Sequence, residues 1–225
     1  MALQDKLDAF KADFEGGRLP LKPSREVLDI MHRATAELIA SGQMQRAKKA
    51  GDAAPDFTLK DPEGKQVALR ELLAKGPLVV SFYRGAWCPY CNLELQALQE
   101  ALPEIVARGA SLVAISPQTA PNSRKSERDN KLSFPILSDV RSAVAEAFGV
   151  RFALPAELVA LYKAFKNDLP TFNDDPAWVL PMPARYVIGR DGIIAYAEVN
   201  PDYTRRPDPS ELLPVLDRLR AGKAA

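Results

Sequence analysis

Residues 81–99 read SFYRGAWCPYCNLELQALQ, and they hold both cysteines of the chain, Cys88 and Cys91. The stretch begins inside an apolar run at residues 78–83, which has the composition of a buried strand. After the cysteines, apolar residues recur with helical spacing at Leu95, Leu98, Leu102, Ile105 and Val106. The C-x-x-C pair is therefore predicted to lie where a buried strand passes into a helix, with Cys91 in the first turn.

This position favours a reactive thiol pair. Unpaired backbone N–H groups and the positive end of the helix dipole lower the pKa of a thiol at a helix start, and the thiolate is the nucleophilic form. Two sulfurs at this spacing can close a small disulfide that another thiol reopens. Trp87, Pro89 and Tyr90 are predicted to give the exposed sulfur an apolar rim on which a partner docks.

Two other interpretations of the cysteines are weaker. A zinc site needs four ligands, or three and a water. The chain has no second C-x-x-C, and its only histidine, His32, lies in the predicted N-terminal arm, so neither a metal nor another cofactor is expected. Two inert packing cysteines are the second alternative, but a helix start is a poor place to bury inert thiols. A redox pair is favoured.

Composition and charge narrow the class of protein. With 225 residues, 47% of them hydrophobic, the chain can bury a full core. Thirty basic against 29 acidic residues give a net charge of +1, which predicts no nucleic-acid or anionic-lipid partner. No apolar run is long enough for a membrane span, and residues 1–17 lack the pattern of a secretory signal. We therefore expect a cytoplasmic protein, where a close cysteine pair is more often catalytic or metal-binding than structural.

The chain is predicted to divide near residue 50. Residues 1–50 form an N-terminal helical extension: an apolar stripe at Leu3, Leu7, Phe10 and Phe14 marks one helix, and Ser24 is a predicted N-cap for another. Residues 51–225 form the domain proper. The stripe needs a partner, and two are expected to be equally suitable: a second subunit, giving a homodimer through these helices, or the rest of the same chain.

The domain proper alternates between strands and helices. Its expected elements are a hairpin at 57–59 and 66–68, the strand and helix around the cysteines, a strand at 111–116, a helix at 122–131, a strand at 135–137, a helix capped by Asp139 that carries Val140, Val144, Ala147 and Phe148, a hairpin at 185–188 and 193–198, and a helix at 209–221. Residues 151–183 are predicted to be an insertion with one helix and a proline-rich loop. This order predicts an α/β fold with a mixed central sheet covered on both faces.

Six segments carry a family resemblance. They are APDFTLKDPEGKQVALREL, VVSFYRGAWCPYCNLEL, LVAISPQ, FPILSD, AFGV and PARYVIGRDG. Over residues 51–200 the chain resembles the peroxiredoxin-like branch of the alkyl hydroperoxide reductase/thiol-specific antioxidant family, within the thioredoxin-fold superfamily. The resemblance implies a thioredoxin-like fold, a mixed central sheet flanked by helices, to which the helical arm is added.

The resemblance leaves the order of the two thiols open. Typical peroxiredoxins carry T-x-x-C, in which the cysteine attacks the peroxide and a Glu or Gln often follows three residues later. On that alignment Cys91 is the attacking residue, Glu94 is the later polar residue, and Cys88 replaces the threonine. Thioredoxins instead attack with the first cysteine of C-x-x-C, which here is Cys88.

Three further residues are candidates for the site. Pro183 falls where typical peroxiredoxins place an arginine and where thioredoxin-like oxidoreductases keep a cis-proline. Arg185 lies on the same face of a strand and could supply the missing charge, the alternative being a solvated strand-end arginine. Arg84 directly follows the strand and could hold the thiolate or polarise a peroxide, the alternative being a solvent-facing charge.

The sequence therefore predicts a thiol-dependent antioxidant oxidoreductase that reduces hydrogen peroxide or organic hydroperoxides. A thiolate becomes a sulfenic acid, the Cys88–Cys91 disulfide forms, and an external dithiol of the thioredoxin or glutathione type reduces it. The alternative is a thioredoxin-like thiol–disulfide oxidoreductase acting on protein or small-molecule disulfides, with Cys88 attacking and Pro183 docking the peptide. A binding or structural module is a third class, and it would make both cysteines dispensable.

Overall fold

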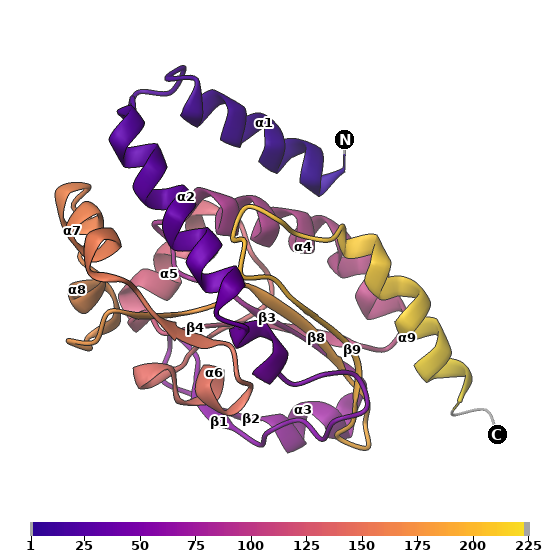
Figure 1. The fold of residues 1–225 in the computed structure, drawn as a ribbon. Helices are drawn as coiled ribbons and strands as arrows, with labels where there is room; N and C mark the ends of the chain where they lie inside the picture. Colours follow the sequence, from indigo (N-terminus) through magenta and orange to yellow (C-terminus); the bar gives the residue numbers. More distant parts are fainter. Residues whose placement is uncertain (1, 223–225) are drawn as a thin grey trace.

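A mixed seven-stranded sheet forms the centre of residues 2–222, the part of the chain that the computed structural model describes (Figure 1). Its strand order is β2-β1-β5-β4-β3-β8-β9, with β3, β4 and β5 parallel and the other pairs antiparallel. The strands are β1 Thr58–Lys60, β2 Gln66–Ala68, β3 Leu78–Phe82, β4 Ser111–Ser116, β5 Ile136–Ser138, β8 Ala184–Ile188 and β9 Ile194–Val199. The inner strand β3 is buried along its whole length.

Helices cover both faces of this sheet. They are α1 Leu3–Glu15, α2 Arg25–Ala40, α3 Leu69–Lys75, α4 Pro89–Ala107, α5 Ala120–Asp129, α6 Ala143–Ala147, α7 Ala156–Ala164, α8 Leu169–Asn173 and α9 Leu212–Ala221, with short 3₁₀ helices η1 Gln43–Arg46, η2 Val140–Ser142 and η3 Pro209–Glu211. The predicted α/β class, a mixed sheet flanked by helices with a helical arm, is confirmed.

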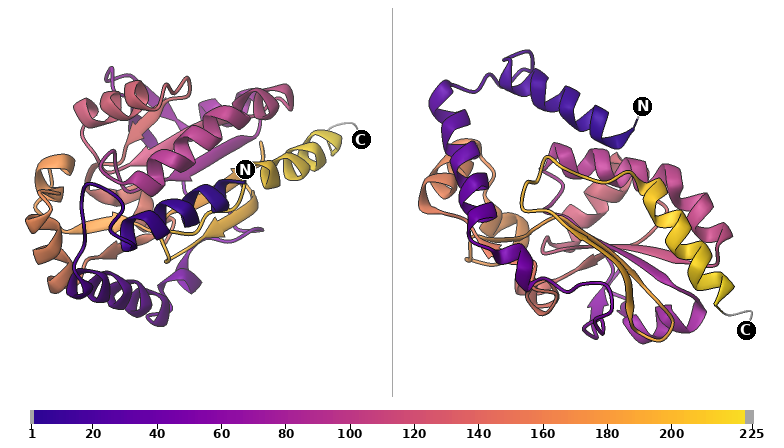
Figure 2. Two further views of the ribbon diagram at one scale, coloured as in Figure 1. Left: turned by 90° about the horizontal axis from the view of Figure 1, so that it is seen from above. Right: turned by 45° about the vertical axis from the view of Figure 1, so that its right-hand side comes forward.

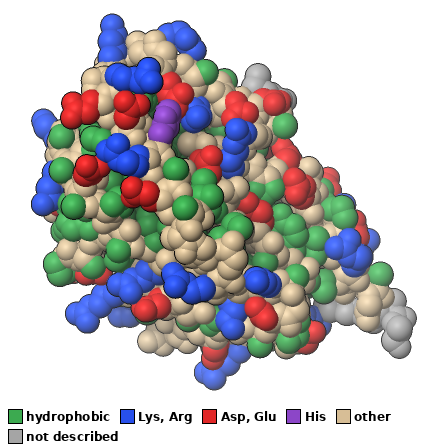
Figure 3. All heavy atoms as spheres, in the orientation of Figure 1, with side chains coloured by type: hydrophobic (Ala, Val, Ile, Leu, Met, Phe, Trp, Pro, Cys, Tyr) green, Lys and Arg blue, Asp and Glu red, His purple; other side chains and the backbone are tan. Residues whose placement is uncertain are grey.

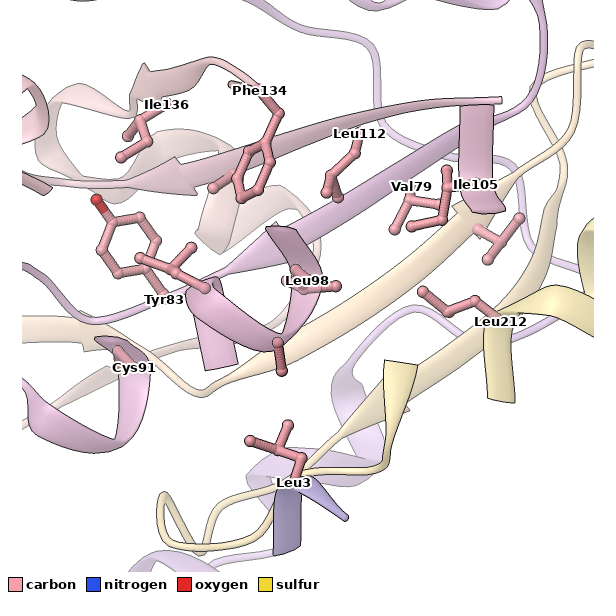
Figure 4. Packing of buried hydrophobic residues seen from close by; sticks show 14 of the residues in the cluster. Leu3, Val79, Tyr83, Cys91, Leu98, Ile105, Leu112, Phe134, Ile136 and Leu212 are labelled. Atoms are coloured by element: carbon pink, nitrogen blue, oxygen red, sulfur yellow. The ribbon is translucent and has the colours of Figure 1, made fainter. Parts of the chain in front are cut away.

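Alternation along β3 divides the core in two. Val79 points to a cluster made with α4, α9 and α1, in which Leu3, Leu98 and Leu212 converge (Figure 4). Its neighbours Leu78 and Val80 point to the other face, where α3 and α6 pack. Successive strand residues face opposite sides of a sheet, so a strand buried on both faces is apolar at nearly every position, as at residues 78–83, where Ser81 is the exception.

The first helix packs against its own chain. Leu3 and Leu7 are fully buried, and both views in Figure 2 show α1 lying across α4. Gln4 ties this helix to the loop before α9, since its Nε2 donates to the Thr204 carbonyl at 3.2 Å and its Oε1 accepts from the Arg206 N–H at 2.9 Å. This half of the predicted stripe is therefore occupied within the chain rather than free for a second subunit.

The helix predicted after Asp139 begins later than expected. Arg141 and Ser142 adopt positive φ angles of 58° and 55°, which end η2 and separate it from α6. Asp139 does cap α6, since its carboxylate accepts from the N–H groups of Val144 at 2.9 Å and Ala145 at 2.8 Å. Val140 consequently lies in η2 and is exposed, so the prediction that the helix carries Val140 together with Val144 is wrong.

Residues 151–183 contain more structure than one helix and a loop. β6 (Arg151–Ala153) pairs antiparallel with β7 (Val179–Pro181) to form a separate two-stranded sheet. Helices α7 and α8 lie between these strands, and α7 also contacts α2 of the N-terminal arm. The segment and the arm thus meet on one side of the molecule, next to the end of β3 (Figure 1).

The surface carries both signs of charge side by side. Acidic and basic side chains are interspersed over the face shown in Figure 3, as expected from a net charge of +1. Within residues 2–222 no helix has both the length and the apolar character that crossing a membrane requires.

Candidate active site

The two cysteines lie where the sequence predicts, at the start of the helix that follows β3. Cys88 is the N-cap residue of α4, Pro89 occupies the first turn, and Cys91 follows in the same turn. Proline suits this position because its missing N–H would be unpaired there in any case. Both cysteines are free thiols and both are fully buried. The expectation of an exposed sulfur is therefore wrong: neighbouring elements cover the pair.

The loop that leads into the pair is held from both sides. Gln118 Oε1 accepts from the Ala86 N–H at 2.9 Å, and Asn92 Nδ2 donates to the Ala86 carbonyl at 2.9 Å. Gly85 has a φ of +148°, and a Cβ there would lie 2.5 Å from Trp87 Nε1. Only glycine fits that backbone next to the indole, so the loop reaches Cys88 in one defined conformation.

Arg84 is buried against Cys88. Its Nη2 donates to Cys88 Sγ at 3.2 Å and its Nη1 to Tyr162 Oη at 3.2 Å. The guanidinium carbon lies 3.9 Å from the centre of the Tyr203 ring and 5.2 Å from that of Trp87. The alternative of a solvent-facing Arg84 is thus wrong, because the side chain is enclosed by aromatic rings with one end on the sulfur.

The environment separates the acidities of the two thiols. Burial by itself raises the pKa of Cys88, but hydrogen bonds from Cys91 and the charge of Arg84 outweigh it and lower the pKa to about 5. The Cys91 backbone N–H contributes, donating to Cys88 Sγ at 3.4 Å. Burial raises the pKa of the Cys91 thiol, and the nearby Cys88 sulfur raises it further. One thiolate in the pair makes a second costly.

Glu94 holds two buried arginines one turn into α4. Its Oε1 accepts from Arg185 Nη2 at 2.8 Å and its Oε2 from Arg206 Nε at 2.5 Å. Arg206 Nη2 lies 4.0 Å from Cys91 Sγ. The alternative of a solvated Arg185 is wrong, because this side chain is fully buried. Glu94 therefore links strand β8 and the loop before α9 to the helix that carries the cysteines.

A second carboxylate borders this cluster. Burial raises the pKa of Glu198 to about 7, the charge of Glu94 raises it as well, and Arg185 and Arg206 oppose the shift. Glu198 pairs with Arg185 across the β8–β9 ladder. The two arginines on the Cys91 side therefore have carboxylates close by.

The predicted apolar rim is only partly exposed. Pro89 is exposed and Trp87 half-buried, whereas Tyr90 is buried between Phe10 and Tyr203, with ring centres 5.1 and 5.4 Å away. Phe10 belongs to α1, so the arm contributes directly to the cover of the cysteine pair.

Two cavities meet at Arg84. The larger, of about 480 Å³, lies between α2, β6 and α7, and Arg84, Tyr162, Pro183 and Tyr203 line it. The smaller, of about 250 Å³, is lined by Arg84, Trp87, Pro89, Tyr90 and residues of α1 and α7. Between residues 2 and 222 no peptide bond is cis, so Pro183 lacks the conformation that the likeness to thioredoxin-type oxidoreductases implied.

The side chains around the cysteines do not resemble a metal site within residues 2–222. His32 lies on the surface of α2, where its Nε2 is 2.8 Å from Glu15 Oε1. The described chain, residues 2–222, brings together no group of three His, Cys, Asp or Glu side chains placed to hold a metal ion.

Sequence reasoning missed three side chains of this site: Tyr162, Tyr203 and Arg206. Tyr162 lies on α7, the one helix predicted within residues 151–183, but nothing in the sequence placed that helix beside the cysteines. Tyr203 and Arg206 come from the proline-rich connection between β9 and α9, which has no periodicity to single them out. These three side chains reach the cysteines because the chain folds back onto them, and no local sequence pattern predicts this contact.

Known proteins resemble this chain in sequence and in fold. The model of the AhpC/TSA family matches residues 50–197. Peroxiredoxin Bcp of Escherichia coli is 34% identical over 102 residues, covering 45% of this chain and 65% of that protein. The chloroplastic peroxiredoxin Q of Oryza sativa is 29% identical over 146 residues, covering 65% and 57% respectively. The peroxidoxin BcpB structure from Mycobacterium tuberculosis superposes with a TM-score of 0.60 at 26% identity, covering 77% of this chain and 97% of that one.

The neighbours in the solved structures are peroxiredoxins, which confirms the thioredoxin-like fold predicted from the sequence. The family model covers well over half of the chain, including β3, both cysteines, Glu94 and Arg185. The protein belongs to the AhpC/TSA family.

Proposed function

We propose that the protein is a thiol-dependent peroxidase, an oxidoreductase that reduces hydroperoxides through Cys88 and Cys91. The observation that carries the proposal is a buried pair of free thiols in an AhpC/TSA fold, with a guanidinium 3.2 Å from one sulfur. A cation at that distance stabilises a thiolate, and the surrounding rings exclude bulk water that would screen it.

The proposed cycle has three steps. A thiolate of the pair attacks one oxygen of the hydroperoxide ROOH, the O–O bond breaks, and the products are a sulfenic acid and RO⁻, which takes up a proton to leave as ROH. The neighbouring thiol attacks the sulfenic sulfur, forming the Cys88–Cys91 disulfide and releasing water. An external dithiol then reduces the disulfide and is itself oxidised to a disulfide.

The partners of this cycle extend the proposal. A thioredoxin- or glutathione-type reductant in the cytoplasm would supply the electrons, in keeping with the reducing state of that compartment. A homodimer through the N-terminal helices would use the outer face of α2, because Leu3 and Leu7 of α1 are already buried within the chain.

The alternative is a thiol–disulfide oxidoreductase acting on protein or small-molecule disulfides. Both this activity and the reduction step of the peroxidase cycle require a foreign sulfur to reach the buried pair, so burial does not distinguish them. The likeness to peroxiredoxins favours the peroxidase.

The first prediction is a rapid loss of two thiols with hydrogen peroxide. Pre-reduced protein is mixed with peroxide in a stopped-flow instrument while Trp fluorescence is followed, and thiols are counted at the end. Trp87 lies next to Cys88 and 5.2 Å from Arg84, so its emission reports the change at the sulfur. Thiols that react no faster than free cysteine, with hydrogen peroxide and with cumene hydroperoxide, would refute the peroxidase.

We propose further that the larger cavity accepts the organic group of a hydroperoxide. Its volume, about 480 Å³, is in the range of small-molecule sites, and its walls are mostly apolar. Arg84 lines this cavity and contacts Cys88 Sγ, so a peroxide group bound at Arg84 would lie near the sulfur.

Narrowing the cavity tests this second prediction. Ala34 lies on α2 and lines the cavity, and Ala34→Phe is expected to lower kcat/KM for cumene hydroperoxide about tenfold while leaving that for hydrogen peroxide within about twofold. Ala40→Phe, at the exposed end of the same helix, is the matched control and should change neither value. Equal losses for both peroxides in Ala34→Phe would contradict this use of the cavity.

A further inference from the structure

Three arginines are buried within residues 2–222, and one of them has no carboxylate partner. Arg185 and Arg206 share Glu94. Arg84 makes no ion pair within that part of the chain, although only 4% of its surface is exposed. Its contacts are the neutral hydroxyl of Tyr162, the ring faces of Tyr203 and Trp87, and the Cys88 sulfur.

A buried cation without an anion is strongly disfavoured. Hydroxyl and ring contacts lessen the cost, but they supply no negative charge to compensate the guanidinium. The one atom in contact with Arg84 that can become an anion near neutral pH is Cys88 Sγ, at 3.2 Å. The geometry alone therefore favours a Cys88 thiolate as the counter-ion of Arg84.

The Cys91 sulfur interacts more weakly with its neighbouring cation, Arg206, than Cys88 does with Arg84. Arg206 lies 4.0 Å from Cys91 Sγ, farther than Arg84 from Cys88. Its guanidinium is already committed: Nε donates to Glu94, and Nη1 donates to the carbonyl oxygens of Tyr203 at 2.8 Å and Arg205 at 2.6 Å. Since one thiolate suppresses ionisation of the other, the negative charge belongs on the sulfur with the uncompensated cation.

The positions of the two cavities also favour Cys88 as the sulfur that a small oxidant reaches. Both cavities are lined by Arg84, and the smaller one is also lined by Trp87, Pro89 and Tyr90, the residues on either side of Cys88. Both cysteines belong to the apolar cluster between α4 and the sheet, where Figure 4 shows Cys91 beside Tyr83, but the hydrogen bond from Arg84 reaches only the sulfur of Cys88. A small oxidant that enters either cavity therefore reaches Arg84, whose Nη2 contacts Cys88 Sγ.

We propose that Cys88 is the attacking thiolate and Cys91 the resolving thiol, the reverse of the order that T-x-x-C implies for this family. The proposal rests on the peroxidase function and deepens it. The Cys88 thiolate attacks the hydroperoxide and becomes Cys88–SOH, with RO⁻ leaving beside Arg84. The Cys91 thiol attacks the Cys88 sulfur, its proton and the sulfenic hydroxyl leave as water, and the disulfide forms.

The order can be tested without any peroxide. In Cys91→Ser only Cys88 reacts with iodoacetamide, and in Cys88→Ser only Cys91 does. The alkylation rate of Cys91→Ser is expected to show a midpoint below the ordinary value of about 8.5 for cysteine, because Arg84 remains beside Cys88, and that of Cys88→Ser a midpoint above that value, because Cys91 stays buried. The opposite pair of midpoints overturns the proposal.

Wild-type protein provides a check that does not depend on the folding of either variant. Reduced protein is treated at about pH 6 with less than one equivalent of iodoacetamide, and the labelled cysteine is identified by peptide mass spectrometry. Label at Cys88 in at least about tenfold excess is expected, whereas label mainly at Cys91 overturns the proposal.

The reaction with peroxide tests the order of the two thiols separately from the peroxidase function. Cys91→Ser should still react with peroxide, and its Cys88 sulfenic acid, with no Cys91 thiol to resolve it, should be trapped by dimedone; Cys88→Ser should react at least about 100-fold more slowly than Cys91→Ser. Fast trapping on Cys91 in Cys88→Ser overturns the order. Slow reaction in the wild type itself, with alkylation still favouring Cys88, refutes the peroxidase and leaves the assignment of the thiolate intact.

Discussion

Glutamine in place of Glu94 is expected to lower the free energy of unfolding by about 3–5 kcal/mol. The substitution keeps the shape of the side chain but removes the negative charge between Arg185 and Arg206, at 2.8 and 2.5 Å. Both guanidiniums would then be buried without their shared anion, which is the arrangement that folded proteins tolerate least. Equilibrium unfolding in urea, followed by far-UV circular dichroism, measures the change.

Glu100→Gln is the matched control for this experiment. Glu100 lies on the same helix, is exposed, and pairs with Lys6 at 3.7 Å. Surface ion pairs contribute about 0–1 kcal/mol, so this variant should unfold nearly as the wild type does. A Glu94→Gln protein as stable as Glu100→Gln would show that the buried cluster does not depend on its carboxylate.

Removing the charge of Arg84 should produce the largest change in reactivity. In Arg84→Gln the Cys88 thiolate loses its cation, and its pKa is expected to rise from about 5 to above about 7. The sign follows from the charged form: the guanidinium stabilises the thiolate, so its loss favours the thiol. At about pH 6 the thiolate changes from the major to a minor species.

The rate with peroxide at about pH 6 should fall about 100-fold in Arg84→Gln, because Arg84 is also close enough to stabilise the leaving RO⁻. Alkylation by iodoacetamide should fall less, since a thiolate of higher pKa is intrinsically more nucleophilic. Stopped-flow rates and the pH midpoint of alkylation give both quantities. Arg84→Lys keeps the positive charge and should restore part of the shift, and an unchanged midpoint in Arg84→Gln would contradict the role given to Arg84.

The fold could be predicted from sequence wherever a pattern is local. β3 was visible as a run that is apolar except at Ser81, because both of its faces are buried. The start of α2 was visible because Ser24 is an N-cap residue type, and it does accept from the Val27 N–H. The β6–β7 pair was not visible, because Arg151–Ala153 and Val179–Pro181 are short and far apart in the chain. Such short strands form because the chain between them folds back, and neither carries an alternating pattern long enough to predict it.

For the site, too, only the features with a local sequence pattern could be predicted. A strand followed by C-x-x-C and a helical pattern placed Cys88 and Cys91 at a helix start, and the resemblance pointed to Glu94 and Arg185. Burial was not predictable from these residues. Arg84 is enclosed by Tyr162 from α7 and Tyr203 from the connection before α9, and these elements are contiguous with it only in space.

The burial of both sulfurs affects the oxidation step and the reduction step of the cycle differently. Oxidation needs room for a hydroperoxide group, which the cavities beside Arg84 provide with the arm in place. Reduction by a protein needs a foreign sulfur in covalent contact with the pair, and Phe10 of α1, Tyr162 of α7 and Tyr203 stand in its way. With a macromolecular electron donor, these side chains therefore have to move aside before the disulfide can be reduced, a displacement that oxidation by a small hydroperoxide does not require.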